Sequence, residues 1–345
     1  MLRHRGCPRP PRQPPPGVGG LRESPESKVS DMKDFNLRHL RIFETIASCG
    51  SFSRAAEQLG MSQPAVSMQL RQLETDLGTL LFERPQRQRL TDAGQDLLQH
   101  ARVILAQVRA TEDAMAVHEA EASGASAAGA RGPRGLLHLG VVSTAHYFAP
   151  RLLSEFHRRH PEVRLKLTVA KRSEVLAMLQ EHRLDIAITG YPPSEADLEA
   201  ASFARHPHCI VAHPGHALAR RRGLAWADLR DEEFIFREGG SATRQFLEHL
   251  LQSQSIQIKR GMELAGNETI KQAVMCGMGI SFLSAHTFQV ELGAGLMAVL
   301  DVQGMPKLID WCFVQRRDTL LTGANAAFRQ FVFEEGATLA ACRVA

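Results

Sequence analysis

The sequence predicts a multi-domain protein in which an all-α winged helix-turn-helix domain and a long helix precede an α/β domain. Three observations predict this fold class. Apolar residues recur at helical spacing over residues 37–121, a stretch rich in Gly, Ala and Ser fills 122–135, and short apolar runs alternate with helical patterns beyond it. The length of 345 residues also exceeds that of one compact core, so several folded units are expected.

The composition is that of a globular protein, with 44% apolar and 23% charged residues. The sequence has no run of about 18 consecutive apolar residues, which a membrane helix needs, and no apolar segment typical of a secretory signal near its start. We therefore expect a cytoplasmic protein that does not associate with membranes. The six cysteines lack the spacing of a zinc site or a disulfide framework, so we expect reduced thiols.

Residues 1–31 are rich in Pro, Arg and Gly, which predicts a disordered extension. They hold six Lys or Arg against three acidic residues, and this surplus accounts for most of the net charge of +4. Net charge is therefore a weak indicator of nucleic-acid binding here, and the positions of individual charges matter more. Met32, just before the first periodic helix, is typical of a natural start, so residues 1–31 are either a mis-assigned start or a functional tail.

The first folded domain is predicted at residues 32–90. One helix starts at Leu37 and ends at Gly50. Ser51 is placed to cap a second helix over Phe52–Leu59, which stops at Gly60. Two short helices in this order are typical of the first part of a helix-turn-helix.

A third helix is predicted between Ser62, which is placed as its N-cap, and Gly78, with Pro64 tolerated in the first turn. Its outward side chains are mostly short or amide groups that can reach base edges or phosphates in a major groove. These residues are Gln63, Ser67, Met68 and Arg71.

Residues 80–82 and 87–90 bracket Pro85 and predict a small β-wing that presents Arg84, Arg87 and Arg89 to a phosphate backbone. From periodicity alone, a plain three-helix packing unit with solvated arginines remains the alternative.

A long helix is predicted over residues 91–121, with Thr91 as its cap and Asp92 in its first turn. Apolar residues then follow at spacings of three and four, which suits a dimeric coiled coil or a lone amphipathic helix packed on its own domain. This seam consists of Leu97, Ala101, Ile104, Val108, Thr111 and Met115.

After a flexible linker at 122–135, strand-like runs at 136–142, 165–169, 184–188 and 209–212 alternate with helical patterns at 152–159 and 175–182. This alternation favours βαβ units. Hydroxyl, amide or glycine residues stand at three apparent helix starts, around Thr144, Ser241 and Asn267. If they converge, their free N–H groups form an anion site; otherwise each is an ordinary cap. Arg237, Arg244 and Lys271 would add positive charge.

Other patterns in the sequence do not predict a metal site, a redox-active thiol or a catalytic site. A metal site is set aside at His206, His208, Cys209, His213 and His216, because Pro207 and Pro214 interrupt the cluster and its spacing matches no standard ligand motif. Cys276 near a helix end fits a buried small hydrophobe better than a redox-sensing thiol. No catalytic constellation is recognisable, so we do not expect an enzyme and we expect no cofactor.

The runs at residues 51–59 (SFSRAAEQL), 62–67 (SQPAVS), 81–84 (LFER) and 90–94 (LTDAG) resemble the LysR-type transcriptional regulators. The resemblance implies that Gln63, Pro64 and Ser67 face double-stranded DNA at a pseudo-palindromic operator. It also implies that Ser53, Arg54 and Arg84 lie near phosphates. This chain departs from the family pattern at Met68, where many relatives carry Arg. The resemblance favours dimerisation through the long helix, and relatives commonly form homotetramers.

The resemblance further implies two α/β lobes like those of periplasmic binding proteins, with the effector between them. Lobe 1 would take residues 136–207 and 308–335, lobe 2 would take 208–307, and 336–345 would form a tail. The helix and wing pattern together with the resemblance predict a DNA-binding set of Ser53, Arg54, Ser62, Gln63, Pro64, Ser67, Met68, Arg71, Arg84, Arg87 and Arg89. The helix starts together with the resemblance predict an effector-binding set of Ser143, Thr144, Ala145, Gly190, Gly240, Ser241, Thr243, Asn267, Glu268 and Thr269.

Residues 141–150, 185–188 and 267–275 resemble regulators of RuBisCO (Calvin-cycle carbon-fixation) operons, with Gly266 where Ser is common and Ala242 where Gly is common. We therefore expect an activator that binds a small anionic effector, either a phosphorylated metabolite or NADPH, and contacts RNA polymerase. The alternatives are a LysR-type regulator that senses oxidation through Cys209 or Cys276, a solute-binding receptor that does not regulate DNA, and an enzyme.

Overall fold

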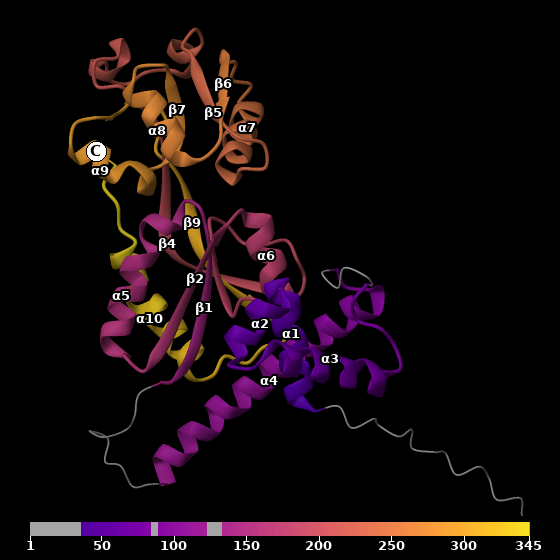
Figure 1. Cartoon of the computed structure of the whole chain (residues 1–345). Coiled ribbons are helices and arrows are strands. Elements are labelled where there is room, and N and C mark those ends of the chain that lie inside the picture. Colours follow the sequence, from indigo (N-terminus) through magenta and orange to yellow (C-terminus); the bar gives the residue numbers. More distant parts are fainter. Residues whose placement is uncertain (1–35, 84–88, 123–132, 345) are drawn as a thin grey trace, which may run out of the picture.

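The computed structural model describes residues 36–83, 89–122 and 133–344 (Figure 1). A helical N-terminal part lies beside the first of two α/β lobes, and the second lobe lies beyond it along two long strands. The predicted order of an all-α domain, a long helix and a two-lobed α/β domain is confirmed. None of the helices within these ranges has the length and apolar character needed to cross a membrane. The predicted disordered extension, residues 1–31, lies outside the described residues.

The three helices of the helix-turn-helix begin and end where the caps predict. They are α1 (Leu37–Cys49), α2 (Phe52–Leu59) and α3 (Gln63–Leu77). The side chains of Ser51 and Ser62 accept hydrogen bonds from backbone N–H groups in the first turns of α2 and α3. Each helix ends at a left-handed residue with φ near 60–71°, a conformation that favours glycine. These residues are Gly50, Gly60 and Gly78.

The described part of the predicted wing pairs across its base. Phe82 and Leu90 form a single antiparallel bridge, and residues 84–88 between them lie outside the described range. The Glu74 carboxylate accepts a hydrogen bond from the Leu81 backbone N–H at 3.0 Å and so fixes the wing to α3. The rings of Phe43 and Phe82 meet edge to face at 5.7 Å, which closes the core of this domain.

Helix α4 (Asp92–Ala122) is capped by Thr91, whose hydroxyl accepts from the Gly94 N–H at 3.0 Å. The predicted apolar seam of α4 does not have one environment along its length. Ala101 is buried in the helix-turn-helix core, whereas Ile104 and Met115 are 38% and 51% exposed. The first part of the helix therefore packs on its own domain, and the later part presents an apolar face to the outside.

Lobe 1 is a three-layer unit. Its core is the sheet β2–β1–β3–β9, in which β1 pairs in parallel with β2 and β3, and β9 is antiparallel to β3. Helices α5 and α10 pack on one face and α6 on the other. The bounds are β1 (Gly135–Val142), α5 (Ala149–Arg159), β2 (Val163–Ala170), α6 (Arg172–Gln180), β3 (Ile186–Thr189), β9 (Lys307–Arg316) and α10 (Gly323–Leu339).

Lobe 2 continues the same sheet in the order β4–β7–β5–β6. Strand β5 pairs in parallel with β6 and β7, while β4 is antiparallel to β7. Helix α7 packs on one face, and α8 packs on the other. The bounds are β4 (Leu198–Ala212), β5 (Phe234–Arg237), α7 (Ala242–Ser253), β6 (Arg260–Leu264), α8 (Asn267–Met275), β7 (Ile280–Ser284), α9 (Gln289–Gly293) and β8 (Ala298–Val299). Four 3₁₀ turns complete the domain: η1 (Ala145–Tyr147), η2 (Ala217–Arg220), η3 (Trp226–Leu229) and η4 (Ala285–Phe288).

Strands β4 and β9 join the lobes. β4 pairs with β9 as far as His208 and with β7 from His208 onward, so the chain passes between lobes at this residue. Pro207, expected to interrupt the local structure, lies inside β4 opposite Leu308. It is tolerated because β7 pairing has not yet begun there. The predicted lobe boundaries fall at these crossings, and the division of the chain into domains stays a proposal.

The C-terminus forms a third link between the lobes. Helix α10 runs to Leu339, four residues past the predicted domain end at 335, and the segment after it reaches lobe 2. There His286 Nε2 donates to the Ala340 carbonyl at 2.8 Å, and the Gln289 side chain exchanges hydrogen bonds with the Arg343 backbone. Residues 340–344 therefore act as a strap from lobe 1 onto lobe 2.

Candidate effector cleft and DNA-binding face

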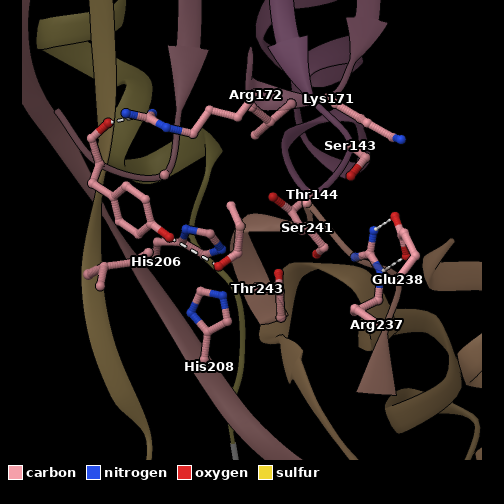
Figure 2. A pocket seen from close by; sticks show the side chains of 16 residues that line it. Ser143, Thr144, Lys171, Arg172, His206, His208, Arg237, Glu238, Ser241 and Thr243 are labelled. Carbon is pink, nitrogen blue, oxygen red and sulfur yellow. Dashed lines mark hydrogen bonds and ion pairs between the residues drawn. The ribbon is translucent and has the colours of Figure 1, made fainter. Parts of the chain in front are cut away.

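A cleft lies where the two lobes meet, and its walls enclose about 520 Å³, including the part open to solvent (Figure 2). Two of the three predicted helix starts converge in it. Ser143 and Thr144 follow β1 of lobe 1, and Ser241 and Thr243 stand at the start of α7 in lobe 2. Because the first N–H groups of a helix lack partners within it and its N-terminus is positive, the start of α7 favours an anionic ligand.

The structure brings six of the ten predicted effector residues to this cleft: Ser143, Thr144, Gly190, Gly240, Ser241 and Thr243. Ala145 is instead fully buried in the core of lobe 1. The third helix start, at Asn267, Glu268 and Thr269, does not line the cleft.

This third helix start forms contacts between the lobes. The Asn267 amide donates to the Ser143 carbonyl at 3.4 Å, and the Tyr147 hydroxyl donates to the Glu268 carboxylate. Lys271, expected to add charge to the cleft, forms ion pairs with Glu268 at 2.9 Å and with Glu291 at 2.7 Å. These residues therefore hold lobe 1 and lobe 2 together beside the cleft.

The cations around the cleft differ in how far they are neutralised. Arg237 donates twice to Glu238 at 2.8 Å, which lowers the pKa of that carboxyl to about 2. Arg244, also predicted to add charge, pairs with Glu248 and Glu263. By contrast, Arg172 and Lys171 line the cleft, and among the residues that the structure describes neither pairs with a carboxylate. The start of α6 is therefore the main source of uncompensated positive charge.

Tyr191 crosses the cleft. Its hydroxyl donates to the Ala242 carbonyl in lobe 2 at 3.0 Å, and burial raises its pKa. Its own carbonyl accepts from Arg172 at 3.0 Å, so it positions that guanidinium. Sequence reasoning missed Tyr191, Arg172 and Lys171. Their location just after strands β3 and β2 was the available signal, because ligands of α/β sheets bind beyond the carboxyl ends of the strands.

His206 and His208, which belong to β4, line one side of the cleft (Figure 2). They are 2% and 1% exposed. Burial lowers the pKa of His206 well below its usual value and that of His208 to about 3, so both rings are neutral at pH 7. The Nδ1 atom of each ring has no hydrogen-bond partner among the described residues. A buried polar atom without a partner typically costs about 1–3 kcal/mol.

From the sequence, these histidines suggested only a metal site, and their spacing argued against one. In the part of the chain that the structure describes, no group of three or more His, Cys, Asp or Glu is placed to hold a metal ion. The signal that the sequence did offer is that the two histidines are two residues apart, which places both rings on one face of a strand.

The predicted DNA-binding residues of α3 lie on its outer side. Gln63, Pro64 and Arg71 are exposed, Ser67 is half-buried, and Met68 is 58% exposed. Because the Ser62 hydroxyl caps α3, the residues after it are held in the first turn of the recognition helix.

The predicted phosphate contacts are only partly described. Ser53 is exposed, and Arg54 donates to the Cys49 carbonyl at the end of α1. Arg89 is exposed at the wing. Arg84 and Arg87 lie outside the described residues.

Comparison with known proteins gives two family matches. The family model described as the LysR substrate binding domain matches residues 130–337, and the model for bacterial regulatory helix-turn-helix proteins of the lysR family matches residues 37–95. The chain belongs to the LysR family of transcriptional regulators. The resemblance read from the sequence is thereby confirmed.

The similar LysR regulators share nearly their whole length with this chain. It is 40% identical to the RuBisCO operon transcriptional regulator of Allochromatium vinosum, over 88% of this chain and 97% of that protein. It is 44% identical to the HTH-type transcriptional regulator CbbR of Rhodospirillum rubrum, over 86% and 95%. The CcmR regulatory domain of Synechocystis PCC6803, solved in complex with 2-PG, superimposes with a TM-score of 0.56 at 33% identity, covering 58% of this chain and 97% of that domain.

The cysteines bear on the redox alternative within the LysR family. Cys209 is buried in lobe 2, and burial raises the pKa of its thiol to about 12. A thiol held in its protonated form is a poor nucleophile toward oxidants. Cys276, expected to be buried, is exposed, because α8 ends at Met275 and Cys276 caps it at the surface.

Proposed function

We propose that this LysR-type regulator is a cytoplasmic activator of carbon-fixation (RuBisCO) genes whose effector is a small anionic metabolite bound between the lobes. The observation that carries the effector class is the cleft. Its hydroxyl groups and the start of α7 share the cleft lining with Lys171 and Arg172, two cations without carboxylate partners in the described structure. Such a site stabilises a phosphate or carboxylate.

The relatives support the choice of target and ligand. Two of them are named as regulators of RuBisCO operons or as CbbR, and the related CcmR domain was solved with 2-PG. We therefore propose 2-PG or a similar phosphorylated metabolite as effector, with NADPH as the second candidate. NADPH is much larger than 2-PG, so its binding would require the lobes to move further apart.

DNA recognition is proposed for the exposed side of α3. Gln63 is the base-reading candidate because an amide side chain can bond two groups on one base edge. Ser67, Met68 and Arg71 follow it along the helix, and Ser53, Arg54 and Arg89 are proposed to lie near phosphates. The apolar Met68 would contact a thymine methyl group instead of making a polar contact.

Assembly is proposed through the outward face of α4. Val103, Ile104 and Met115 are exposed there, and a single helix rarely leaves such a row without a partner. A homodimer places two recognition helices against successive half-sites of a pseudo-palindromic operator. We also propose that two dimers pair into a homotetramer and that the regulator contacts RNA polymerase.

The decisive experiment is footprinting of the full chain on DNA upstream of the RuBisCO operon of its own genome, with and without 2-PG or NADPH. We expect protection of a pseudo-palindromic site and a change in its extent when the effector is present. Thr144→Val is expected to abolish the effector-dependent change and to retain basal DNA binding. Protection elsewhere in the genome but not at this operon would overturn the proposed target, and a footprint insensitive to every tested anion would overturn the effector class.

A further inference from the structure

The cleft carries positive charge on one wall and neutral polar rings on another. The rings belong to His206 and His208, whose centroids are 4.2 Å apart on strand β4. The hydroxyl residues that suit an anion, Thr144, Ser241 and Thr243, lie to the right of these rings in Figure 2. A ligand that fills the cleft therefore contacts both groups that suit an anion and neutral imidazole rings.

Packing holds both histidine rings in place. His206 stacks on Trp311 with ring centroids 3.7 Å apart and planes within 12°, and its Nε2 bonds to the Ser284 hydroxyl at 2.8 Å. His208 stacks on Phe282 at 5.2 Å and meets the edge of Phe246 at 5.1 Å. Neither ring can turn its unpartnered Nδ1 toward another group without losing these contacts. The partner of each Nδ1 must therefore come to the ring.

Gly190 lies against one of these buried atoms, His206 Nδ1. A Cβ atom at this position would lie 3.2 Å from His206 Nδ1 and 3.5 Å from Ile309 Cδ1. The backbone of Gly190 does not need the left-handed conformation that favours glycine. A side chain at this position would therefore crowd the Nδ1 edge of the imidazole.

We propose that the Nδ1 atoms of His206 and His208 select the effector by hydrogen bonding to a second polar oxygen, while its anionic group binds the hydroxyls and the start of α7. This inference rests on the proposed function. The ligand class that fits is a small acid with two separate polar ends, such as a phosphorylated hydroxy or carboxylic acid. A simple inorganic anion can bind the hydroxyls and the start of α7 but does not supply a second oxygen for the histidine Nδ1 atoms.

The test is the binding of 2-PG and of inorganic phosphate to the full chain by titration calorimetry, with intrinsic tryptophan fluorescence as a second readout for 2-PG. Trp311 stacks on His206, so a ligand that bonds this ring will change its emission; Trp226→Phe leaves Trp311 as the only tryptophan of the chain. We expect His208→Leu to weaken 2-PG binding about tenfold and to leave the weaker binding of phosphate unchanged, because a lost hydrogen bond in a dry site is worth up to about that factor. His208→Asn, whose amide nitrogen replaces Nδ1, is expected to recover part of the affinity.

Gly190→Ala is the matched variant that keeps both histidines. Its methyl group covers His206 Nδ1, so it should lower the affinity for 2-PG and spare that for phosphate. Thr144→Val, on the anion wall, should weaken both ligands. If wild type binds 2-PG and both His208→Leu and Gly190→Ala bind it equally well, the histidine inference is wrong and the anionic effector stands. If wild type binds none of 2-PG, phosphate and NADPH, the proposed effector class fails with it.

Discussion

Acid is expected to destabilise the α/β domain, because its buried neutral histidines must gain protons when the chain unfolds. Burial lowers the pKa of His208 to about 3 and those of His138 and His286 to about 4. In an unfolded chain each ring has a pKa near 6.5, so below that pH the unfolded state binds more protons than the folded state. The stabilisation is therefore complete above pH 6.5 and is lost as the pH falls toward 3–4.

The size of the effect follows from the same shifts. At pH 5, about 1.5 units below the unfolded pKa, each histidine removes about 2 kcal/mol, or roughly 6 kcal/mol for the three. This loss is comparable with the whole free energy of unfolding of a typical domain, about 5–15 kcal/mol. The window from pH 7.5 to pH 5 also stays above the usual range in which carboxylates take up protons.

The assay is urea unfolding at several pH values, followed by tryptophan fluorescence. Both tryptophans of the chain, Trp226 and Trp311, lie in the α/β domain and therefore report on it alone. His208→Leu is expected to lose about 2 kcal/mol less than wild type between pH 7.5 and pH 5. His249, which is exposed, provides the matched control His249→Leu, with a pH dependence parallel to wild type. A His208→Leu curve that also runs parallel would refute this reasoning.

Three further predictions concern the N-terminal half. Gln63→Ala should cost about 1–3 kcal/mol at the cognate operator and relax preference at one base, whereas Arg89→Ala, at an exposed position of the wing, should weaken all DNA sequences alike; gel-shift series on single-base operator variants distinguish them, and uniform loss for Gln63→Ala would exclude base reading. Gly94→Ala should destabilise the winged domain by about 1–3 kcal/mol, because its Cβ would lie 2.1 Å from the Leu81 carbonyl oxygen; helical circular dichroism on heating measures this, and an unchanged melting temperature would contradict it. Ile104→Asp on the open face of α4 should reduce the oligomer to a smaller species in light scattering, and an unchanged mass would argue against this interface.

The helix-turn-helix was predictable almost residue by residue because its limits are set locally. Ser51 and Ser62 start helices through their own side chains, and glycines end them through their own backbone angles. The α4 seam was less predictable. Its spacing is the same whether a residue packs on its own domain, as Ala101 does, or faces outward, as Ile104 does. Local pattern defines an apolar face but does not identify its partner.

The effector cleft was only half predictable. Hydroxyl and glycine residues at helix starts can be read from the sequence, whereas the contributions of His206, His208 and Tyr191 depend on how β4 passes between lobes and which groups face it. Pro207 concealed the strand, since proline usually argues against a strand interior. Asn267 was placed in the cleft because its type and position suit an anion, but the register of the lobes turns it toward Ser143.

The C-terminal strap constrains how the lobes can move. Two antiparallel strands alone would permit both bending and twisting, but residues 340–344 add a third crossing that is bonded to His286 and Gln289. Opening of the cleft must therefore either carry α10 along or detach its end from lobe 2. His286 also approaches Ser284, the hydrogen-bond partner of His206, at 3.5 Å. Three hydrogen bonds thus link Ala340 through His286 and Ser284 to His206, which lines the cleft, and a shift of that ring on ligand binding is expected to reach the end of the chain.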